Sequence, residues 1–344
     1  MKEIIVGVSG INAVDNPGPG IGVARSLKED KDLDVRIVGL AYDAMEPGIY
    51  MDWLIDKSFI MPYPSAGHDA HISRLLYIKE SYGLDFVLPT LDAELPLYIK
   101  YASELERNGI KTFLPTLEQF KLRSKDRLEE VAREIGMKFP KTRVVSSYQQ
   151  LRDAVEEIGL PVMVKGIFYG AEKAYTVQEA IAHFNKIASQ WGFPIIVQEM
   201  VSGEEVNVVG AGDGEGGHLG LFAIKKLWIT SLGKIWTGVS IENDALLEFA
   251  DRFVSTYRWR GGFELECIAK DDEIYLIEIN PRFPAWVYFA TGSGLNIPAN
   301  VLRRALEMDY EVKDYEAGRL YVRYTYELVT DMEKLHYMTT KGEA

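Results

Sequence analysis

Strand-like and helix-like segments alternate along the first 116 residues, and this alternation constrains the fold more than any other feature. Short apolar runs typical of buried strands cover residues 3–10, 34–40, 84–90 and 110–116. The segments between them that are typical of helices are 18–30, 68–83 and 92–109. Strands that alternate with helices of this length predict a parallel sheet, because parallel strands need long crossover connections. We therefore expect an α/β domain over residues 1–115.

Beyond residue 115 the pattern changes to helices followed by closely spaced strands. The expected helices are 124–136, 148–159 and 176–192, and the strands after residue 192 follow one another at short intervals up to a last one at 320–329. The run GDGEGG at 212–217 is typical of a hairpin loop. These features predict an α+β region with antiparallel sheets, which we divide into domains at 116–200 and 201–344.

Composition narrows the class of protein. The 344 residues are 47% hydrophobic and carry a net charge of −13, which favours a globular fold. The acidic balance argues against nucleic acid or an anionic membrane as a partner, since both require basic surfaces. Cys267 is the single cysteine, and the beginning of the chain lacks the apolar stretch of a signal peptide. We expect a cytoplasmic protein without an internal disulfide.

Polar side chains interrupt two apolar strands in the stretch GGFELECIAKDDEIYLIEINPR, residues 261–282. Because side chains alternate along a strand, Glu264 and Glu266 share one face of the first strand. Glu278 and Asn280 likewise share a face of the second. A three-residue turn at 271–273 would place Glu266 opposite Glu278, where two carboxylates repel each other unless a cation lies between them. Carboxylate and amide oxygens without histidine suit Mg²⁺; the alternative is a solvated strand face.

Three cationic residues point to a phosphorylated ligand. Arg282 comes just after the predicted metal face, where a guanidinium would stabilise a transferring phosphoryl group. Lys165 ends an apolar strand, where a charge is costly without a partner. Lys125 falls in the first turn of the expected helix 124–136, where its sign opposes the helix dipole. The alternative for both lysines is a solvated ammonium on a packed stem.

The segment QEMVSGEEVNVV at 198–209 has the form of a strand, a short turn and a second strand. The backbone from Glu199 to Val201 would offer an N–H and a C=O to the edge of a base. Glu205 would accept hydrogen bonds from ribose hydroxyl groups.

Other motifs are less specific. The glycine turn at 18–22 lacks the GxGxxG spacing of a dinucleotide site, and its N–H groups would more readily face a substrate carboxylate. His68 and His71 have no third metal ligand nearby in sequence. Asp92 and Glu94 follow a strand at its carboxyl end, where α/β sheets bind ligands, although Asp92 would equally serve as a helix cap.

Four motifs in order resemble the ATP-grasp superfamily: SKDRLEEVAREIGMKFPKT, LPVMVKG, VQEMVSGEE and the stretch that ends in IEINPR. With ATGSGLNIPANVLRRAL after it, this last stretch is most similar to the synthetase domains of carbamoyl-phosphate synthase and to carboxylate–amine ligases. The resemblance spans about 170 residues. It implies an N-terminal pre-ATP-grasp domain with a parallel sheet, followed by a two-lobed ATP-grasp domain with antiparallel sheets.

The resemblance also implies roles for individual residues. Lys125 and Lys165 would contact the phosphates of ATP, Glu199 and Val201 the adenine, and Glu205 the ribose. The metal ligands for Mg²⁺, with Mn²⁺ as an alternative, would be Glu266, Glu278 and Asn280, and Arg282 would be catalytic. One departure is the region after Lys165, where the glycine-rich flap of the family is short. Either the flap is shortened and Lys173 would supply a charge, or the phosphates are covered in a different way.

The activity implied is an ATP-dependent ligase that joins a small-molecule carboxylate to an amine through an acyl phosphate, as a monomer or a homodimer. Two alternatives stay open. One is an enzyme that phosphorylates bicarbonate or carbamate, like carbamoyl-phosphate synthase, and the other is an inactive nucleotide-binding protein.

Overall fold

The computed structural model describes residues 3–344 except 15, 168–169 and 231–232. The chain divides into two compact units, each built from segments that are separate in sequence. The large unit comprises residues 1–121, 207–265 and 279–344, and the small unit comprises 122–206 and 266–278. The division into domains at 115 and 200 stays a prediction.

A parallel sheet forms the N-terminal part of the large unit, as the sequence predicts. Its strands are β1 (Ile4–Ser9), β4 (Val35–Ala41), β5 (Lys57–Ile60) and β6 (Phe86–Leu88), in the order β5-β4-β1-β6 with all neighbours parallel. The chain moves outward from β1 on one side to β5 and then returns to place β6 on the other side. This reversal of direction lies between β1 and β6.

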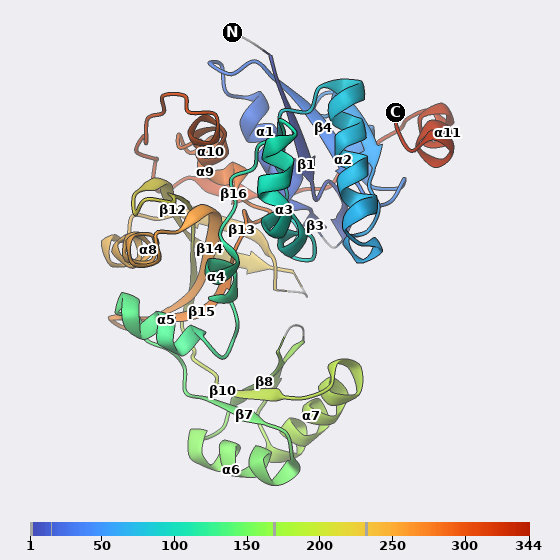
Figure 1. Cartoon of the computed structure of the whole chain (residues 1–344). Helices are drawn as coiled ribbons and strands as arrows, with labels where there is room; N and C mark the ends of the chain where they lie inside the picture. The colour runs from blue at the N-terminus through green and yellow to red at the C-terminus, as the bar shows by residue number, and fades with distance from the viewer. Residues whose placement is uncertain (1–2, 15, 168–169, 231–232) are drawn as a thin grey trace. The chain divides into compact units, whose positions relative to one another are not determined.

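Helices cover both faces of this sheet (Figure 1). Helix α1 (Pro19–Lys28) packs on one face, while α2 (His68–Tyr82) and α3 (Leu95–Arg107) pack on the other. Gly83 adopts a φ of 87° and ends α2, as expected for a glycine after a helix. The predicted strand at 110–116 is wrong, since only Lys111 forms a bridge to the sheet. Phe113 and Leu114 turn into the apolar cores instead.

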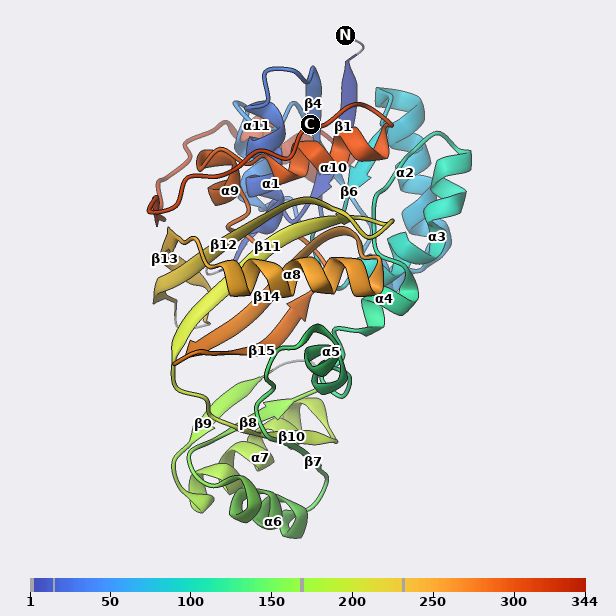
Figure 2. The same cartoon turned by 90° about the vertical axis from the view of Figure 1, so that its left-hand side faces the viewer.

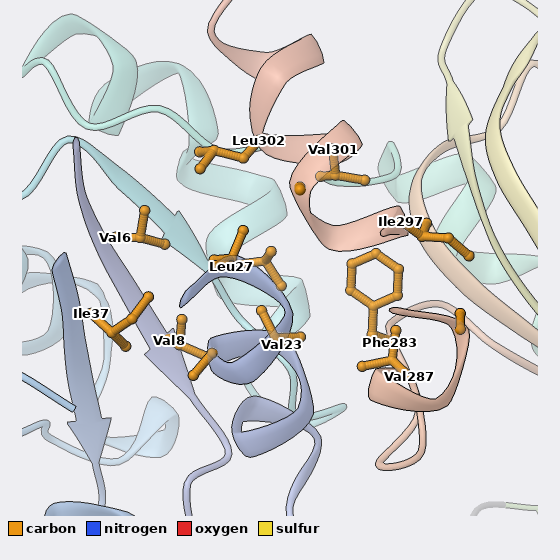
Figure 3. Packing of buried hydrophobic residues seen from close by; sticks show 14 of the residues in the cluster. Val6, Val8, Val23, Leu27, Ile37, Phe283, Val287, Ile297, Val301 and Leu302 are labelled. Carbon is orange, nitrogen blue, oxygen red and sulfur yellow. The ribbon is translucent and has the colours of Figure 1, made fainter. Parts of the chain in front are cut away.

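Later segments complete the core on the α1 face. Val8 and Ile37 of the sheet lie beside Val23 and Leu27 of α1, and α10 (Ile297–Ala305) adds Val301 (Figure 3). Because these side chains are almost completely buried, the segment after residue 279 is anchored to the N-terminal sheet.

A six-stranded sheet in the order β15-β14-β11-β12-β13-β16 contains the antiparallel strands expected after residue 200. Its strands are β11 (Glu204–Asp213), β12 (His218–Ile229), β13 (Ile235–Ser240), β14 (Arg260–Lys270), β15 (Glu273–Asn280) and β16 (Leu320–Val322). Helix α8 (Asp244–Tyr257) lies along this sheet against β12 (Figure 2). The last strand is shorter than the predicted 320–329, because Arg323 turns inward to bond the Ala285 carbonyl.

Short elements complete the large unit. They are β2 (Ala13–Val14), β3 (Asn16–Pro17), the 3-10 helices Pro47–Tyr50 and Pro64–Ala66, α4 (Leu117–Lys121), α9 (Tyr288–Gly292) and α11 (Met332–Lys341). None of the helices in the described ranges has the length and apolar character that crossing a bilayer requires.

The small unit is an antiparallel sheet with helices. Its strands are β7 (Thr142–Val145), β8 (Val162–Gly166), β9 (Ala171–Ala174) and β10 (Ile195–Glu199), in the order β7-β10-β8-β9. Its helices are α5 (Leu128–Ile135), α6 (Tyr148–Ile158) and α7 (Val177–Trp191). The Thr176 side chain accepts from the Glu179 N–H and so caps α7 where the predicted helix 176–192 begins.

Helix α5 begins later than the sequence suggests. Arg127 occupies the cap position without a side-chain cap, and its N–H bonds the Ser124 carbonyl in a preceding turn. The placement of Lys125 in the first helical turn is therefore wrong, because Lys125 lies in this turn instead.

Candidate active site

Two lysines lie close together in the small unit. The Lys165 ammonium on β8 donates to Gln198 Oε1 at 2.7 Å, and the Lys125 ammonium donates to the Gly166 carbonyl at 2.6 Å. Burial and the nearby Lys125 charge lower the pKa of Lys165 to about 8, against the opposing effect of Glu278 and Glu266. Burial also lowers the pKa of Lys125, although Glu278 acts to raise it. The structure thus brings both predicted phosphate contacts together with two of the predicted metal ligands.

The hairpin that carries Glu266 and Glu278 has a shorter turn than expected. Strand β14 continues to Lys270 and β15 begins at Glu273, so the turn contains Asp271 and Asp272 rather than three residues. Asp271 adopts a φ of 53°, a left-handed conformation that aspartate tolerates in tight turns. The direct pairing of the two glutamates stays a prediction, while their shared effect on Lys165 shows that both carboxylates lie near one ammonium.

A buried carboxylate to which the sequence assigned no role lies in the large unit. Glu264 Oε1 accepts hydrogen bonds from Asn207 Nδ2 and from Trp286 Nε1, both at 2.8 Å. Glu264 Oε2 accepts from Asn280 Nδ2 at 2.9 Å. Only 4% of Glu264 is exposed, in keeping with a charge held by several donors. Its sequence signal was an acidic residue at the centre of an apolar strand.

Arg282 lies beside this carboxylate and is held from a second side. Its Nε and one terminal nitrogen lie 3.3 Å and 3.2 Å from Asp92 Oδ2, and that terminal nitrogen lies 3.3 Å from Asn280 Oδ1. The other terminal nitrogen is 3.9 Å from Glu264 Oε2. Helix α3 begins only at Leu95, so Asp92 acts as an ion-pair partner and not as its cap. Asp92 follows β6, at the reversal point where open α/β sheets bind ligands.

A second carboxylate near that sheet edge is fully buried. Glu94 accepts hydrogen bonds from the side chains of Ser9 and Tyr42 and from the N–H groups of Thr90 and Leu91. Burial raises its pKa despite these donors. Glu94 therefore ties β1, β4 and the loop after β6 together, which makes its role structural.

The predicted nucleotide-base contacts lie at the end of β10. The Glu199 N–H donates to the Lys141 carbonyl at 2.8 Å, so that donor is already used within the small unit. Val201 follows the end of β10, and Glu205 lies half-buried near the start of β11. A Cβ on Gly203 would lie 2.3 Å from the Ala269 carbonyl oxygen, so the turn between β10 and β11 requires glycine.

The shortened flap is a hairpin of β8 and β9. The Gly166 N–H donates to the Gly170 carbonyl at 3.0 Å, while the flap residues 168–169 lie outside the described residues. Lys173 is exposed on β9, and its carbonyl accepts from His183. Coverage of a phosphate by this segment stays a prediction.

The less specific motifs have structural explanations. A Cβ on Gly20 would lie 2.0 Å from the Ser9 carbonyl oxygen, so the glycine turn reflects close packing of α1 on β1. His68 bonds Asp69 and Glu104, whereas His71 is buried and its pKa is lowered by burial. Across the described residues, no group of three or more His, Cys, Asp and Glu side chains is arranged to hold a metal ion. Cys267 is buried, as free cysteines commonly are.

A cavity of about 430 Å³ lies elsewhere in the large unit. Its wall includes the ion pair between Arg303 and Asp30 and the side chain of Asn300. None of the predicted site residues lines it.

Comparison with known proteins agrees with these observations. Residues 121–285 match the family model of the ATP-grasp domain. The biotin carboxylase domain of Hydrogenobacter thermophilus 2-oxoglutarate carboxylase, a dimer with MgADP, ADP and bicarbonate, is 17% identical with a TM-score of 0.69, and the match covers 92% of this chain and 73% of that one. Campylobacter jejuni biotin carboxylase in a β-γ-ATP complex is 15% identical with a TM-score of 0.68, covering 89% and 72%.

A third similar structure has a different activity in its name. Phosphoribosylglycinamide synthetase of Anaerococcus prevotii is 16% identical with a TM-score of 0.60, and the match covers 90% of this chain and 76% of that one. At these identities the likeness is one of fold. Residues 121–285 thus match the ATP-grasp domain, and the chain shares the fold of these solved structures, as its motifs indicated.

Proposed function

We propose that this protein is an ATP-dependent ligase that activates a substrate carboxylate as an acyl phosphate and joins it to an amine. The observation that carries the proposal is the pair of lysines in the small unit. Lys165 and Lys125 are close enough for one charge to lower the pKa of the other. Two half-buried ammonium groups repel each other, and a polyphosphate beside them would add negative charge to that of Glu266 and Glu278.

The residues for a divalent metal ion fit the proposal in their donor chemistry. Glu266, Glu278 and Asn280 would hold Mg²⁺, or Mn²⁺ in its place, because all three offer hard oxygen atoms. The Asn280 Nδ2 donates to Glu264, so its Oδ1, which accepts from Arg282, is the atom that would bind the cation. When bound, the metal ion supplies neutralisation of the charge on the phosphate oxygens.

The reaction would proceed in two substitutions. An oxygen of the substrate carboxylate attacks the γ-phosphorus of ATP, and the bond from that phosphorus to the ADP oxygen breaks. The amine nitrogen then attacks the acyl carbon, phosphate leaves with its electron pair, and the nitrogen loses a proton. Arg282 would stabilise the charge that develops on the transferring group, since its guanidinium is already oriented by Asp92 and Asn280.

Nucleotide binding in this proposal uses the small unit. Lys125 and Lys165 contact the phosphates, the backbone of Glu199 and Val201 meets the adenine, and Glu205 accepts from the ribose. Only the Glu199 carbonyl and the Val201 N–H serve the base, because the Glu199 N–H already bonds Lys141.

A second candidate is phosphorylation of bicarbonate. It is favoured by the likeness to a biotin carboxylase domain whose structure contains bicarbonate. That domain is a dimer, and we include a homodimer in the proposal, to be checked by sedimentation of the purified chain.

The test is ADP formation from MgATP with panels of amino acids and other carboxylates, each with and without an added amine, and with bicarbonate alone. The ligase proposal predicts ADP formation that depends on one carboxylate, with an amide detected by mass spectrometry. ADP formation that depends on bicarbonate alone would support the second candidate. ATP binding without stimulation by any compound of either class would contradict both.

A further inference from the structure

We propose that Glu264 is a positioning residue, which fixes the orientation of the Asn280 amide and through it the Arg282 guanidinium. This inference rests on the proposed function for its chemical meaning. It adds to that function a residue outside the set assigned to metal, nucleotide or phosphoryl contacts.

The hydrogen bonds of Glu264 require a carboxylate. Two N–H donors, Asn207 Nδ2 and Trp286 Nε1, converge on Oε1, while Asn280 Nδ2 points at Oε2. A glutamine has one acceptor oxygen and would turn its own N–H₂ group toward at least one of these donors. The indole N–H of Trp286 cannot reverse its role, so the amide oxygen of a glutamine would be kept at the Oε1 position. Its N–H₂ group would then face Asn280.

The orientation of Asn280 passes directly to Arg282. With Nδ2 bound to Glu264, Asn280 presents Oδ1 to a terminal nitrogen of Arg282 at 3.3 Å. If the amide turned over, its N–H₂ group would face the guanidinium and a donor would meet a donor. The same reversal would withdraw Oδ1 from a metal ion. Glu264 therefore sets the direction of the Asn280 oxygen without needing to touch the substrate.

Burial makes this arrangement stiff. Glu264 is 4% exposed and Asn280 7% exposed, so water does not readily replace a lost partner. The Asp92 carboxylate holds Arg282 from its other side, which leaves the guanidinium between two fixed groups.

The experiment exchanges the carboxylate and the amide. Glu264→Gln should lower kcat for ADP formation about 10- to 100-fold, the range seen when a residue that orients a ligand is replaced. Asn280→Asp places two buried carboxylates against each other and should also lower kcat. In the double variant, which combines Glu264→Gln with Asn280→Asp, the new amide can donate to the new carboxylate while still accepting from Asn207 and Trp286. Most of the loss should therefore be recovered.

Two further readouts do not depend on turnover. One is the thermal midpoint of the protein without nucleotide, and the other is the gain in ADP affinity on adding Mg²⁺, measured by calorimetry. Both should fall in each single variant and recover in the double. Glu264→Gln with Asn300→Asp is the matched control, because Asn300 is also buried but bonds the backbone carbonyls of Leu219 and Glu311. The losses caused by Glu264→Gln and by Asn300→Asp should be additive in this control.

If the losses of Glu264→Gln and Asn280→Asp simply add up in the double variant, the inference is overturned, because Glu264 would then not act through Asn280. Recovery of the thermal midpoint without recovery of the Mg²⁺-dependent gain would also overturn it, by making the pair purely structural. Failure of the proposed function looks different. The wild type would then show no carboxylate-dependent ADP formation, while the double variant of Glu264→Gln and Asn280→Asp would still recover the Mg²⁺-dependent gain in ADP affinity.

Discussion

The fold shifts the pKa of the Lys165 ammonium toward neutral pH. Its pKa is lowered to about 8 by burial and by Lys125. Above about pH 8 and below the ordinary lysine pKa of about 10.4, the unfolded chain binds a proton that the folded chain has lost. The contribution of Lys165 to the free energy of unfolding therefore rises with pH across that window. Polyphosphate reverses the preference, because a nearby negative charge favours the ammonium form.

Binding of MgATP near pH 9 should therefore draw a proton onto the protein. The uptake appears as a binding enthalpy that changes with the ionisation enthalpy of the buffer. Lys165→Met should reduce the uptake and weaken ATP binding, whereas Lys165→Arg should bind ATP with reduced uptake because arginine stays charged. Equal proton uptake in wild type and Lys165→Met would show that this ammonium does not meet the phosphates.

Arg282 should matter more for the reaction than for binding. Arg282→Ala should leave ATP affinity within about tenfold but lower kcat roughly 10²–10³-fold, the range for loss of one donor at a developing charge. Arg282→Lys should restore little, because one ammonium cannot meet both Asp92 and Asn280 as the guanidinium does. Nucleotide titration and ADP formation at saturating substrates check this on the same variants. A large loss of affinity with kcat preserved would make Arg282 a ground-state binder.

Charged residues beside apolar strands in the sequence indicated some residues of the site but not the residues that bond them. Lys165 and Arg282 stood out because each puts a charge beside an apolar strand. The structure gives Lys165 a partner in Gln198 and Arg282 one in Asp92. Glu264 was passed over because its donors come from residues 207, 280 and 286, and a single sequence carries no signal for contacts between separate segments.

At the scale of elements, prediction succeeded where the signal was local. The start of α7 at Thr176 and the end of α2 at Gly83 follow from residue chemistry at those positions. Three boundaries failed because packing decided them. The segment 110–116 leaves the sheet after one bridge, Lys125 precedes its helix, and the last strand stops when Arg323 turns inward.

The cap of α7 gives a test of the small unit alone. Thr176→Ala removes the oxygen that accepts from the Glu179 N–H at 3.1 Å and should lower the free energy of unfolding by about 1 kcal/mol. Thr176→Ser keeps the oxygen and should cost less. Chemical denaturation followed by circular dichroism measures both. A similar loss for serine and alanine would assign the effect to the lost methyl group and not to the cap.

At the scale of the whole molecule, the sequence predicts the architecture but not the boundaries of the compact units. The parallel-then-antiparallel architecture was confirmed, and it follows from alternation and strand spacing. The compact units are discontinuous, since residues 207–265 and 279–344 join the N-terminal sheet and residues 266–278 join the small unit. Strands β14 and β15 cross this division, and no change of composition marks the crossing. Packing between distant segments, such as that of Val301 on α1, joins residues 279–344 to the N-terminal sheet.

The most direct test of the central claim follows oxygen from the substrate. A carboxylate found to stimulate ADP formation is labelled with ¹⁸O in both oxygens, and the phosphate released with the amide product is analysed by mass spectrometry. If the carboxylate attacks the γ-phosphorus of ATP, each phosphate formed carries one labelled oxygen from the substrate. Phosphate without label, released at the same rate as ADP, would show that water attacks ATP and would contradict activation through an acyl phosphate.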